Sequence, residues 1–219
     1  MASIFESSHP VVHHKIASLR DVRTAPPEFR SLVRSLAMLM AHEATADLPT
    51  SESEVRTPMG VARVRRLSDK IGIVPILRAG LGMVDGILEL LPEAEVWHLG
   101  MFRDERTLMP TEYYNKLPSR CSLGLALVVD PMLATGGSAV HACEILKRSG
   151  VERIKLISLI AAPEGIARMN EAMPHVPIHV GVIDPRLNEI GFIDPGLGDA
   201  GDRQFATTPQ HESGESISG

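Results

Sequence analysis

LGLALVVDPMLATGGSAVHACEILKRS, residues 123–149, joins an apolar run to a helical run through a turn that contains Gly136 and Gly137. The run 123–129 is apolar on both faces, which is typical of a parallel strand covered by helices on each side. Residues 138–149 have helical spacing, with basic residues in the last turn and Gly150 as the stop. This stretch therefore predicts a strand–turn–helix unit of an α/β sheet.

The same alternation of apolar runs and helical stretches continues on both sides of this unit. Short apolar runs predict strands, and apolar side chains at helical spacing predict helices. The further predicted strands are 71–77, 94–101, 154–162 and 178–183, and the further predicted helices are 28–47, 81–91 and a segment from Pro163. Such an alternation is typical of a doubly wound α/β fold with a mostly parallel sheet.

Three segments do not fit this alternation. Residues 102–122 predict a charged loop that is longer than ordinary connections, and loops of that length are usually functional or disordered. Residues 191–203, GFIDPGLGDAGDR, hold four glycines and three aspartates, so we expect backbone geometry rather than core packing to set their shape. The small, polar residues 206–219 are expected to form a disordered tail.

The composition is that of a soluble globular chain. Hydrophobic residues make up 44% and charged residues 22% of the 219 residues, which excludes a largely disordered protein and fits one domain. There is no run of about 18 apolar residues, so we expect no membrane contact. Residues 1–10 lack the pattern of a secretory signal, and Cys121 and Cys143 lack metal-site spacing, so we expect a cytoplasmic protein with buried thiols. The net charge of −5 argues against a nucleic-acid partner.

The turn after residues 123–129 is the strongest candidate site. Thr135, Gly136, Gly137 and Ser138 place backbone N–H groups and two hydroxyls at the start of a helix, where an anion such as phosphate is stabilised. Asp130 does not suit a phosphate, but its carboxylate can accept hydrogen bonds from sugar hydroxyls. The pattern predicts a phosphorylated-sugar site, with a simple helix-capping turn as the alternative. It is not a Walker A loop, because no lysine follows the glycines.

A second strand-to-helix turn holds Arg78, followed by Gly80, Gly82 and Gly86. The Arg78 guanidinium is placed to bind a second phosphate group with two parallel hydrogen bonds. Two alternatives stay open for the glycines. They are suited to close packing of a helix, and their spacing is one residue from the dinucleotide-binding fingerprint, for which Asp104 would supply the acid.

The charged loop brings together Arg103, Arg106 and Lys116 with two tyrosines, Tyr113 and Tyr114. Cations on a loop near two phosphate-binding turns suggest a lid over a polyanion. A solvated loop and a surface on which RNA bases stack are the alternatives.

The segment 196–202, GLGDAGD, has too few bulky side chains to recognise a ligand by packing. Its main-chain N–H and C=O groups suit a small planar base, and Asp199 and Asp202 suit water bound to Mg²⁺. A glycine turn with a purely structural use is the alternative. The histidines show no helical pair, so we expect no histidine metal site.

VVDPMLATGGSA, residues 128–139, resembles the phosphoribosyl pyrophosphate (PRPP) signature of the uracil phosphoribosyltransferase family. Further segments similar to that family follow the same order: PILRAGLGMVDG (75–86), RDERTLMPTEYYNKLP (103–118), LIAAPEG (159–165) and PGLGDAGDR (195–203). The resemblance runs from about His9 to Phe205. Val129 stands where the wider superfamily has a second acid, which is the form of the uracil branch. Gln204 and the added polar tail depart from the family, and residues 55–68 match less clearly.

The resemblance implies a type I phosphoribosyltransferase fold with a small hood and an N-terminal helical arm. We therefore expect a single domain at 1–205, with its core at about 71–183 and a hood made by the N-terminal arm and 184–205. The implied reaction of pyrimidine salvage converts uracil and PRPP into UMP and pyrophosphate with Mg²⁺, through an oxocarbenium-like transition state. A homodimer or homotetramer is also implied. Regulation by a nucleotide such as GTP, known in some members of the family, stays open because residues 55–68 match less clearly. A phosphoribosyltransferase for another base and an RNA-binding pyrimidine regulator on the same fold remain alternatives.

The resemblance also assigns site residues. The implied catalytic residues are Arg103, Asp130 and Asp199. The implied PRPP-binding residues are Arg78, Arg103, Asp130, Pro131, Met132, Leu133, Ala134, Thr135, Gly136, Gly137, Ser138 and Asp199. The implied uracil-binding residues are Ile193, Gly198, Asp199 and Ala200. The protein is expected to bind Mg²⁺ only indirectly, with PRPP and water holding the ion near Asp199.

Overall fold

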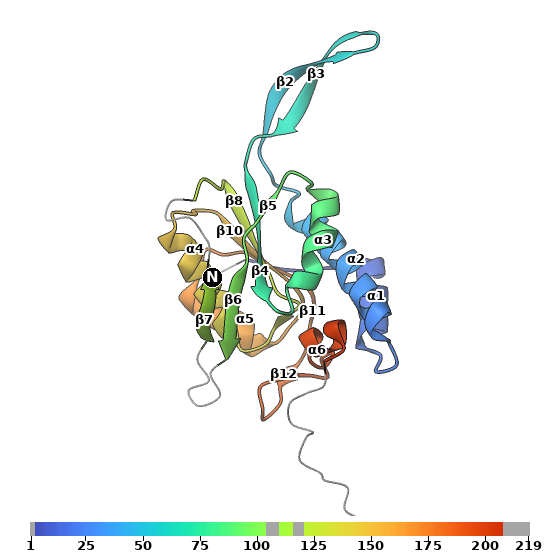
Figure 1. Ribbon diagram of the computed structural model, residues 1–219, viewed down its shortest axis with the longest axis vertical. Helices are drawn as coiled ribbons and strands as arrows, with labels where there is room; N and C mark the ends of the chain where they lie inside the picture. Colours follow the sequence, from blue (N-terminus) through green and yellow to red (C-terminus); the bar gives the residue numbers. More distant parts are fainter. Residues whose placement is uncertain (1–2, 104–109, 116–120, 208–219) are drawn as a thin grey trace, which may run out of the picture.

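The computed structural model describes residues 3–103, 110–115 and 121–207, and its middle layer is one sheet (Figure 1). In the order of the sheet the strands are β1 (Ile4–Glu6), β11 (Ile178–Ile183), β10 (Ile154–Ala161), β8 (Leu125–Val129), β4 (Ile71–Leu77), β6 (Leu99–Arg103) and β7 (Pro110–Asn115), with β5 (Glu95–Val96) beside β4 and β9 (Met132–Leu133) beside β10. All neighbouring pairs are parallel except β6 and β7. The predicted mostly parallel α/β sheet is confirmed.

Helices cover both faces of this sheet. Figure 1 shows α1 (Pro10–Arg20), α2 (Pro26–Ala44) and α3 (Leu81–Leu90) on one side, and α4 (Gly137–Arg148) and α5 (Pro163–Ala172) on the other. Successive side chains of a strand point to opposite faces, so β8 supplies both cores. Leu125, Leu127 and Val129 pack with α1 to α3, whereas Ala126 and Val128 pack with α4 and α5. The apolar runs without a polar face follow from this double coverage.

The glycines after β4 serve close packing. A Cβ atom at Gly80 would collide with the carbonyl oxygen of Val129, and one at Gly86 would collide with the carbonyl oxygen of Arg34 on α2. At Gly82 it would meet the side-chain amide of Gln204. The close-packing interpretation of this glycine pattern is confirmed.

We expect Gly86→Ala to lower the free energy of unfolding by about 2 kcal/mol, because the added methyl group forces α2 and α3 apart. Helix propensity alone predicts an increase in the free energy of unfolding, since alanine is favoured over glycine inside a helix by up to about 1 kcal/mol. Urea unfolding checks the difference, with Asp85→Ala on the exposed side of α3 as the control. An unchanged or larger free energy of unfolding for Gly86→Ala would contradict the packing argument.

The C-terminal segment packs on the N-terminal helices through α6 (Ala200–Phe205). The Arg203 guanidinium donates to the carbonyl oxygens of Leu19 (2.8 Å) and Asp21 (2.6 Å) and lies 4.4 Å from the ring centroid of Phe29. A short antiparallel pair, β12 (Arg186–Leu187) and β13 (Ile193–Asp194), precedes α6. These contacts place residues 184–205 beside the start of the chain.

Several boundaries differ from the prediction. The helix predicted at 28–47 is α2, which starts at Pro26 because proline is well suited to the first helical turn. The strand predicted at 94–101 is divided into β5 and β6. The loop predicted at 102–122 is in part a strand, because β7 pairs with β6 at the edge of the sheet without an apolar run to reveal it. Some predictions fall on residues that lie outside the described ones, which are 104–109, 116–120 and 208–219. They concern Arg106, Lys116 and most of the predicted tail.

A hairpin that the sequence patterns did not predict extends away from the layers (Figure 1). Its strands are β2 (Thr50–Thr57) and β3 (Gly60–Leu67), and most of their side chains are exposed. Charged residues interrupt both strands, so no apolar run marks them. Within the described residues no helix combines the length and the apolar character needed to cross a bilayer.

Two smaller expectations also need correction. Cys143 is buried in α4, where burial raises the pKa of its thiol to about 12, but Cys121 is only half-buried. Residues 191–203 were expected to lack core contacts, yet Ile193, Leu197 and Ala200 are buried in the apolar cluster around α2. Their small number and wide spacing concealed this role in the sequence.

Candidate active site

The turn that follows β8 lies at the carboxyl edge of the sheet and is held there by backbone hydrogen bonds. The carbonyl oxygen of Pro131 accepts from the N–H groups of Leu159 (3.0 Å) and Ile160 (3.1 Å) of β10. Gly136 caps α4 with a φ of 76°, and a Cβ atom there would lie 2.8 Å from the carbonyl oxygen of Gly165. Only glycine satisfies both conditions, so the glycine-rich turn has a fixed shape.

This turn forms one wall of a pocket of about 300 Å³. The pocket brings together three parts of the chain that are distant in sequence. They are the glycine-rich turn 134–138 with its flanking residues, which we call the phosphate-loop candidate, the segment 191–199 before α6, and the first turns of α5. The lining residues are Asp130, Met132, Leu133, Ala134, Thr135, Gly136, Gly137, Ser138, Ala139, Arg168, Gly191 and Asp199. Backbone N–H groups at the start of α4 therefore face two carboxylates across one cavity.

The charge of Asp199 acts on Asp130. The pKa of Asp130 is raised to about 7, mainly by burial and to a smaller extent by the negative charge of Asp199, while a hydrogen bond from the N–H of Met132 acts in the opposite direction. Asp199 is itself oriented as the N-cap of α6, where its carboxylate accepts from the N–H of Asp202 at 2.9 Å. Near neutral pH Asp130 therefore changes between an acceptor and a donor of hydrogen bonds.

Arg78 does not line this pocket. It lies beside α6, the helix whose N-cap residue, Asp199, lines the pocket. Its guanidinium donates to Asp202 at 3.0 Å, and Asp202 also accepts from the Thr207 hydroxyl at 2.5 Å. Asp202, which was considered for magnesium-bound water, is thus paired with a cation. The Arg78 side chain is 58% exposed, so its guanidinium can exchange this partner for a ligand without a change in the fold.

The remaining predicted residues are placed less closely around the cavity. Pro131 is buried and supports the turn through its carbonyl oxygen, while Ile193 and Ala200 are buried behind the segment 196–199. Gly198 has a φ of 76° and, like these three, does not line the 300 Å³ cavity. Arg103 ends β6, and its side chain lies outside what the structure describes.

The sequence analysis assigned no site role to three residues of this region, Gly165, Arg168 and Gly191. Arg168 and Gly191 line the cavity, and Gly165 presses against the phosphate-loop candidate. The segment LIAAPEG pointed to Gly165, and Arg168 follows it by one helical turn on the same face of α5. That spacing is the signal that identifies Arg168.

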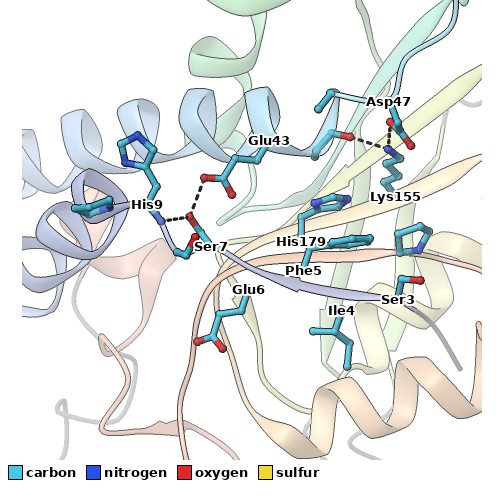
Figure 2. A pocket seen from close by; sticks show the side chains of 15 residues that line it. Ser3, Ile4, Phe5, Glu6, Ser7, His9, Glu43, Asp47, Lys155 and His179 are labelled. Carbon is cyan, nitrogen blue, oxygen red and sulfur yellow. Dashed lines mark hydrogen bonds and ion pairs between the residues drawn. The ribbon is translucent and has the colours of Figure 1, made fainter.

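A larger cavity, of about 830 Å³, lies at the opposite edge of the sheet, where β10 and β11 begin (Figure 2). Its polar groups mostly bind one another. The buried Lys155 ammonium donates to the Ala44 carbonyl oxygen at 2.7 Å and to the Asp47 carboxylate, and the Ser7 hydroxyl donates to Glu43 at 2.8 Å. This cavity has no glycine-rich helix start, so the chemistry points to the smaller pocket despite the difference in volume.

His179 in this large cavity makes stability depend on pH. Its ring stacks on Phe5 at 4.8 Å, and its buried Nε2 has no hydrogen-bond partner among the described residues. Burial, with a smaller effect of Lys155, lowers its pKa to about 4. Asp47 acts in the opposite direction. Because the folded pKa is below the unfolded value of about 6.5, the unfolded state binds more protons between these values, and stability is lost as pH falls through this range.

Between pH 8 and pH 5 the free energy of unfolding should decrease by about 2 kcal/mol less in His179→Phe than in wild type. The reason is that phenylalanine keeps the stacking but does not titrate. Urea unfolding at both pH values measures this. His14→Gln, at an exposed position of α1, is the control. Equal losses of stability in wild type and His179→Phe would show that burial of His179 is not the cause.

In the part of the chain that is described, no group of three histidine, cysteine, aspartate or glutamate residues is arranged to hold a metal ion. The two carboxylates of the small pocket, together with the N–H groups of the turn, are suited to a sugar phosphate: N–H groups for the phosphate and carboxylates for hydroxyl groups. The geometry of the pocket is therefore that of a site for an anionic sugar.

Comparisons with known proteins agree with the family resemblance of the motifs. The family model described as uracil phosphoribosyltransferase matches residues 6–207. A uracil phosphoribosyltransferase of Roseiflexus castenholzii is 55% identical over 207 residues, which are 94% of this chain and 100% of that protein. The structure of the AQ2163 protein from Aquifex aeolicus is similar with a TM-score of 0.88 and 42% identity, over 94% of this chain and 99% of that one.

A more distant structure shares the fold alone. The adenine phosphoribosyltransferase of Leishmania donovani is similar with a TM-score of 0.53 and 12% identity, over 86% of each chain. The predicted type I phosphoribosyltransferase fold is thereby confirmed. The family model and the Roseiflexus relative each cover nearly the whole chain. The chain therefore belongs to the uracil phosphoribosyltransferase family.

Proposed function

We propose that this enzyme transfers the phosphoribosyl group of PRPP to uracil and forms UMP and pyrophosphate. The observation that carries the proposal is the small pocket, in which the glycine-rich start of α4 and the carboxylates of Asp130 and Asp199 face one cavity. The relatives named uracil phosphoribosyltransferase support the choice of uracil as the base.

The reaction forms a bond between N1 of uracil and the anomeric carbon and breaks the bond from that carbon to pyrophosphate, while the N1 proton is released. Positive charge builds on the ribose ring, so the transition state resembles an oxocarbenium ion. Residues Ala134 to Ser138 bind the 5′-phosphate in this proposal, and Asp130 accepts hydrogen bonds from the ribose hydroxyls. The main requirement is orientation of the two reactants and stabilisation of the leaving group.

Uracil is recognised in this proposal by the main chain around Ile193, Gly198, Asp199 and Ala200. A rigid backbone supports such recognition. The buried Asp184 accepts from the N–H of Gly196 at 3.1 Å and from Arg20 at 2.8 and 2.6 Å, while Arg20 also donates to the Gly196 carbonyl oxygen at 2.8 Å. These bonds hold the segment that leads to Gly198 in one conformation.

Arg78 and Arg103 bind the pyrophosphate end of PRPP in this proposal, and Arg78 leaves Asp202 to do so. Mg²⁺ suits the donor set, because it prefers one or two carboxylates together with substrate phosphates and water. Asp199 would hold it through water, with Asp130 nearby. When bound, the ion supplies positive charge to the departing pyrophosphate.

We also propose a cytoplasmic homodimer or homotetramer, as the family resemblance implies, with GTP as an effector. The hairpin of β2 and β3 supports self-association, since Met59, Val61 and Leu67 are exposed on it. The proposed organisation remains a domain at 1–205, in which the contacts of α6 with the N-terminal helices support the hood.

Conversion of labelled uracil to UMP tests the proposal, with PRPP and Mg²⁺ each omitted in turn. We expect UMP only in the complete mixture, and no nucleotide from hypoxanthine or orotate under the same conditions. Product from one of those bases in place of uracil, or no product from any base, would refute the proposed activity.

A further inference from the structure

The first turns of α5 lie directly against the turn proposed to bind the 5′-phosphate. A Cβ atom at Gly165 would lie 2.7 Å from the carbonyl oxygen of Leu133 and would collide with that of Ala134. Arg168, three residues later on the same helix face, runs along the other side of the turn. A Cβ atom at Gly137 would lie only 3.2 Å from its Nη1 atom, and one at Gly136 would lie 3.3 Å from its Cβ.

The charge of this pocket is unbalanced without Arg168. Its lining contains the carboxylates of Asp130 and Asp199, and among the described lining residues Arg168 carries the single positive charge. The other groups that suit a phosphate are neutral N–H groups and hydroxyls of the turn. A phosphate dianion close to two carboxylates is disfavoured unless a cation lies beside it.

Arg168 is also available to a ligand. The structure gives it no ion pair with a described carboxylate, and its side chain is exposed. An arginine binds phosphate with parallel N–H donors, so it adds both charge and direction to a site made of backbone N–H groups.

We infer that Arg168 binds the 5′-phosphate of PRPP and UMP and selects 5′-phosphorylated ligands. The inference rests on the proposed function for the identity of the ligands. The guanidinium of Arg168 on α5 thereby adds a positive charge to a phosphate-binding site that is otherwise formed by the turn before α4. Because Arg168 contacts the turn and not the carboxyl end of β4, its effect is confined to the 5′-phosphate end of the ligand.

Calorimetry of four ligands tests this assignment: ribose 5-phosphate, UMP, inorganic pyrophosphate, and uridine, which lacks the phosphate. For Arg168→Ala we expect about tenfold weaker binding of ribose 5-phosphate and UMP, since a charge-assisted hydrogen bond is lost at an exposed position. Uridine and pyrophosphate should bind as in wild type. Arg168→Lys, which keeps the charge without the planar fork, should bind UMP with intermediate affinity.

Arg148→Ala is the matched control, because Arg148 is an exposed arginine at the far end of α4, about 16 Å along the helix from the turn. Wild-type binding of ribose 5-phosphate and UMP by Arg168→Ala would overturn the inference. Equal weakening of UMP and uridine would also overturn it, because that pattern indicates a structural role. If wild type forms no UMP from uracil, the proposed function fails, whereas ribose 5-phosphate binding still decides the role of Arg168.

Discussion

Gly165→Ala should lower kcat/KM for PRPP by about 100-fold and, like Gly86→Ala, lower the free energy of unfolding by about 2 kcal/mol. The added methyl group would collide with the carbonyl oxygen of Ala134 and lie 2.7 Å from that of Leu133. Both are backbone atoms of the turn that is proposed to bind the 5′-phosphate, so the turn must shift. A displacement of about 1 Å at a binding site is enough to cost about 100-fold in rate.

The measurement is steady-state kinetics with PRPP varied at saturating uracil, together with circular dichroism to confirm the fold. Ala167→Ser, at an exposed position of the same helix, is the control and should keep wild-type kinetics. Alanine is a better helix former than glycine, so α5 itself is not weakened. Wild-type kcat/KM in Gly165→Ala would mean that the turn tolerates displacement, and that its position does not limit catalysis.

The central strands and the glycine-rich turn could be predicted from the sequence because their signals are local. The run 123–129 is apolar throughout, so its composition alone predicts that both faces of the strand are buried. Gly136 lies within eight residues of this strand. The family motifs are equally local. The parts of the fold that depend on such stretches were predicted with boundaries that differ by a few residues.

The missed features depend on contacts between distant segments. Strand β7 is polar in sequence and is defined by its pairing with β6 at the sheet edge. Arg78 pairs with Asp202, 124 residues away, and no spacing rule links such positions. Arg168 has no motif of its own, and its proximity to Gly137 follows from the close contact of Gly165 with the turn. A site assembled from three segments is visible only after the segments have packed.

The second large effect is expected at Asp130. Asp130→Asn should lower kcat/KM for PRPP by about 100-fold to 1000-fold, the usual cost of removing one oriented electrostatic group from an active site. The amide keeps the size of the carboxyl group but loses its charge and one acceptor oxygen. Asp85→Asn, on the exposed side of α3, should keep wild-type kinetics. Wild-type kinetics in Asp130→Asn would contradict the proposed role in binding the ribose hydroxyls.

The pH profile separates the role of Asp130 from a merely structural one. Its pKa of about 7 lies far above the ordinary value of 3.8, first because of burial and then because of the charge of Asp199. The ionised form accepts from the ribose hydroxyls, so kcat/KM of wild type should fall as pH decreases through about 7. Asp199→Asn removes the second cause, and the acid limb should therefore move to lower pH, while burial still keeps it above 3.8. An acid limb at the same pH in Asp199→Asn and wild type would show that the two carboxylates do not interact, and the shared pocket would lose its electrostatic basis.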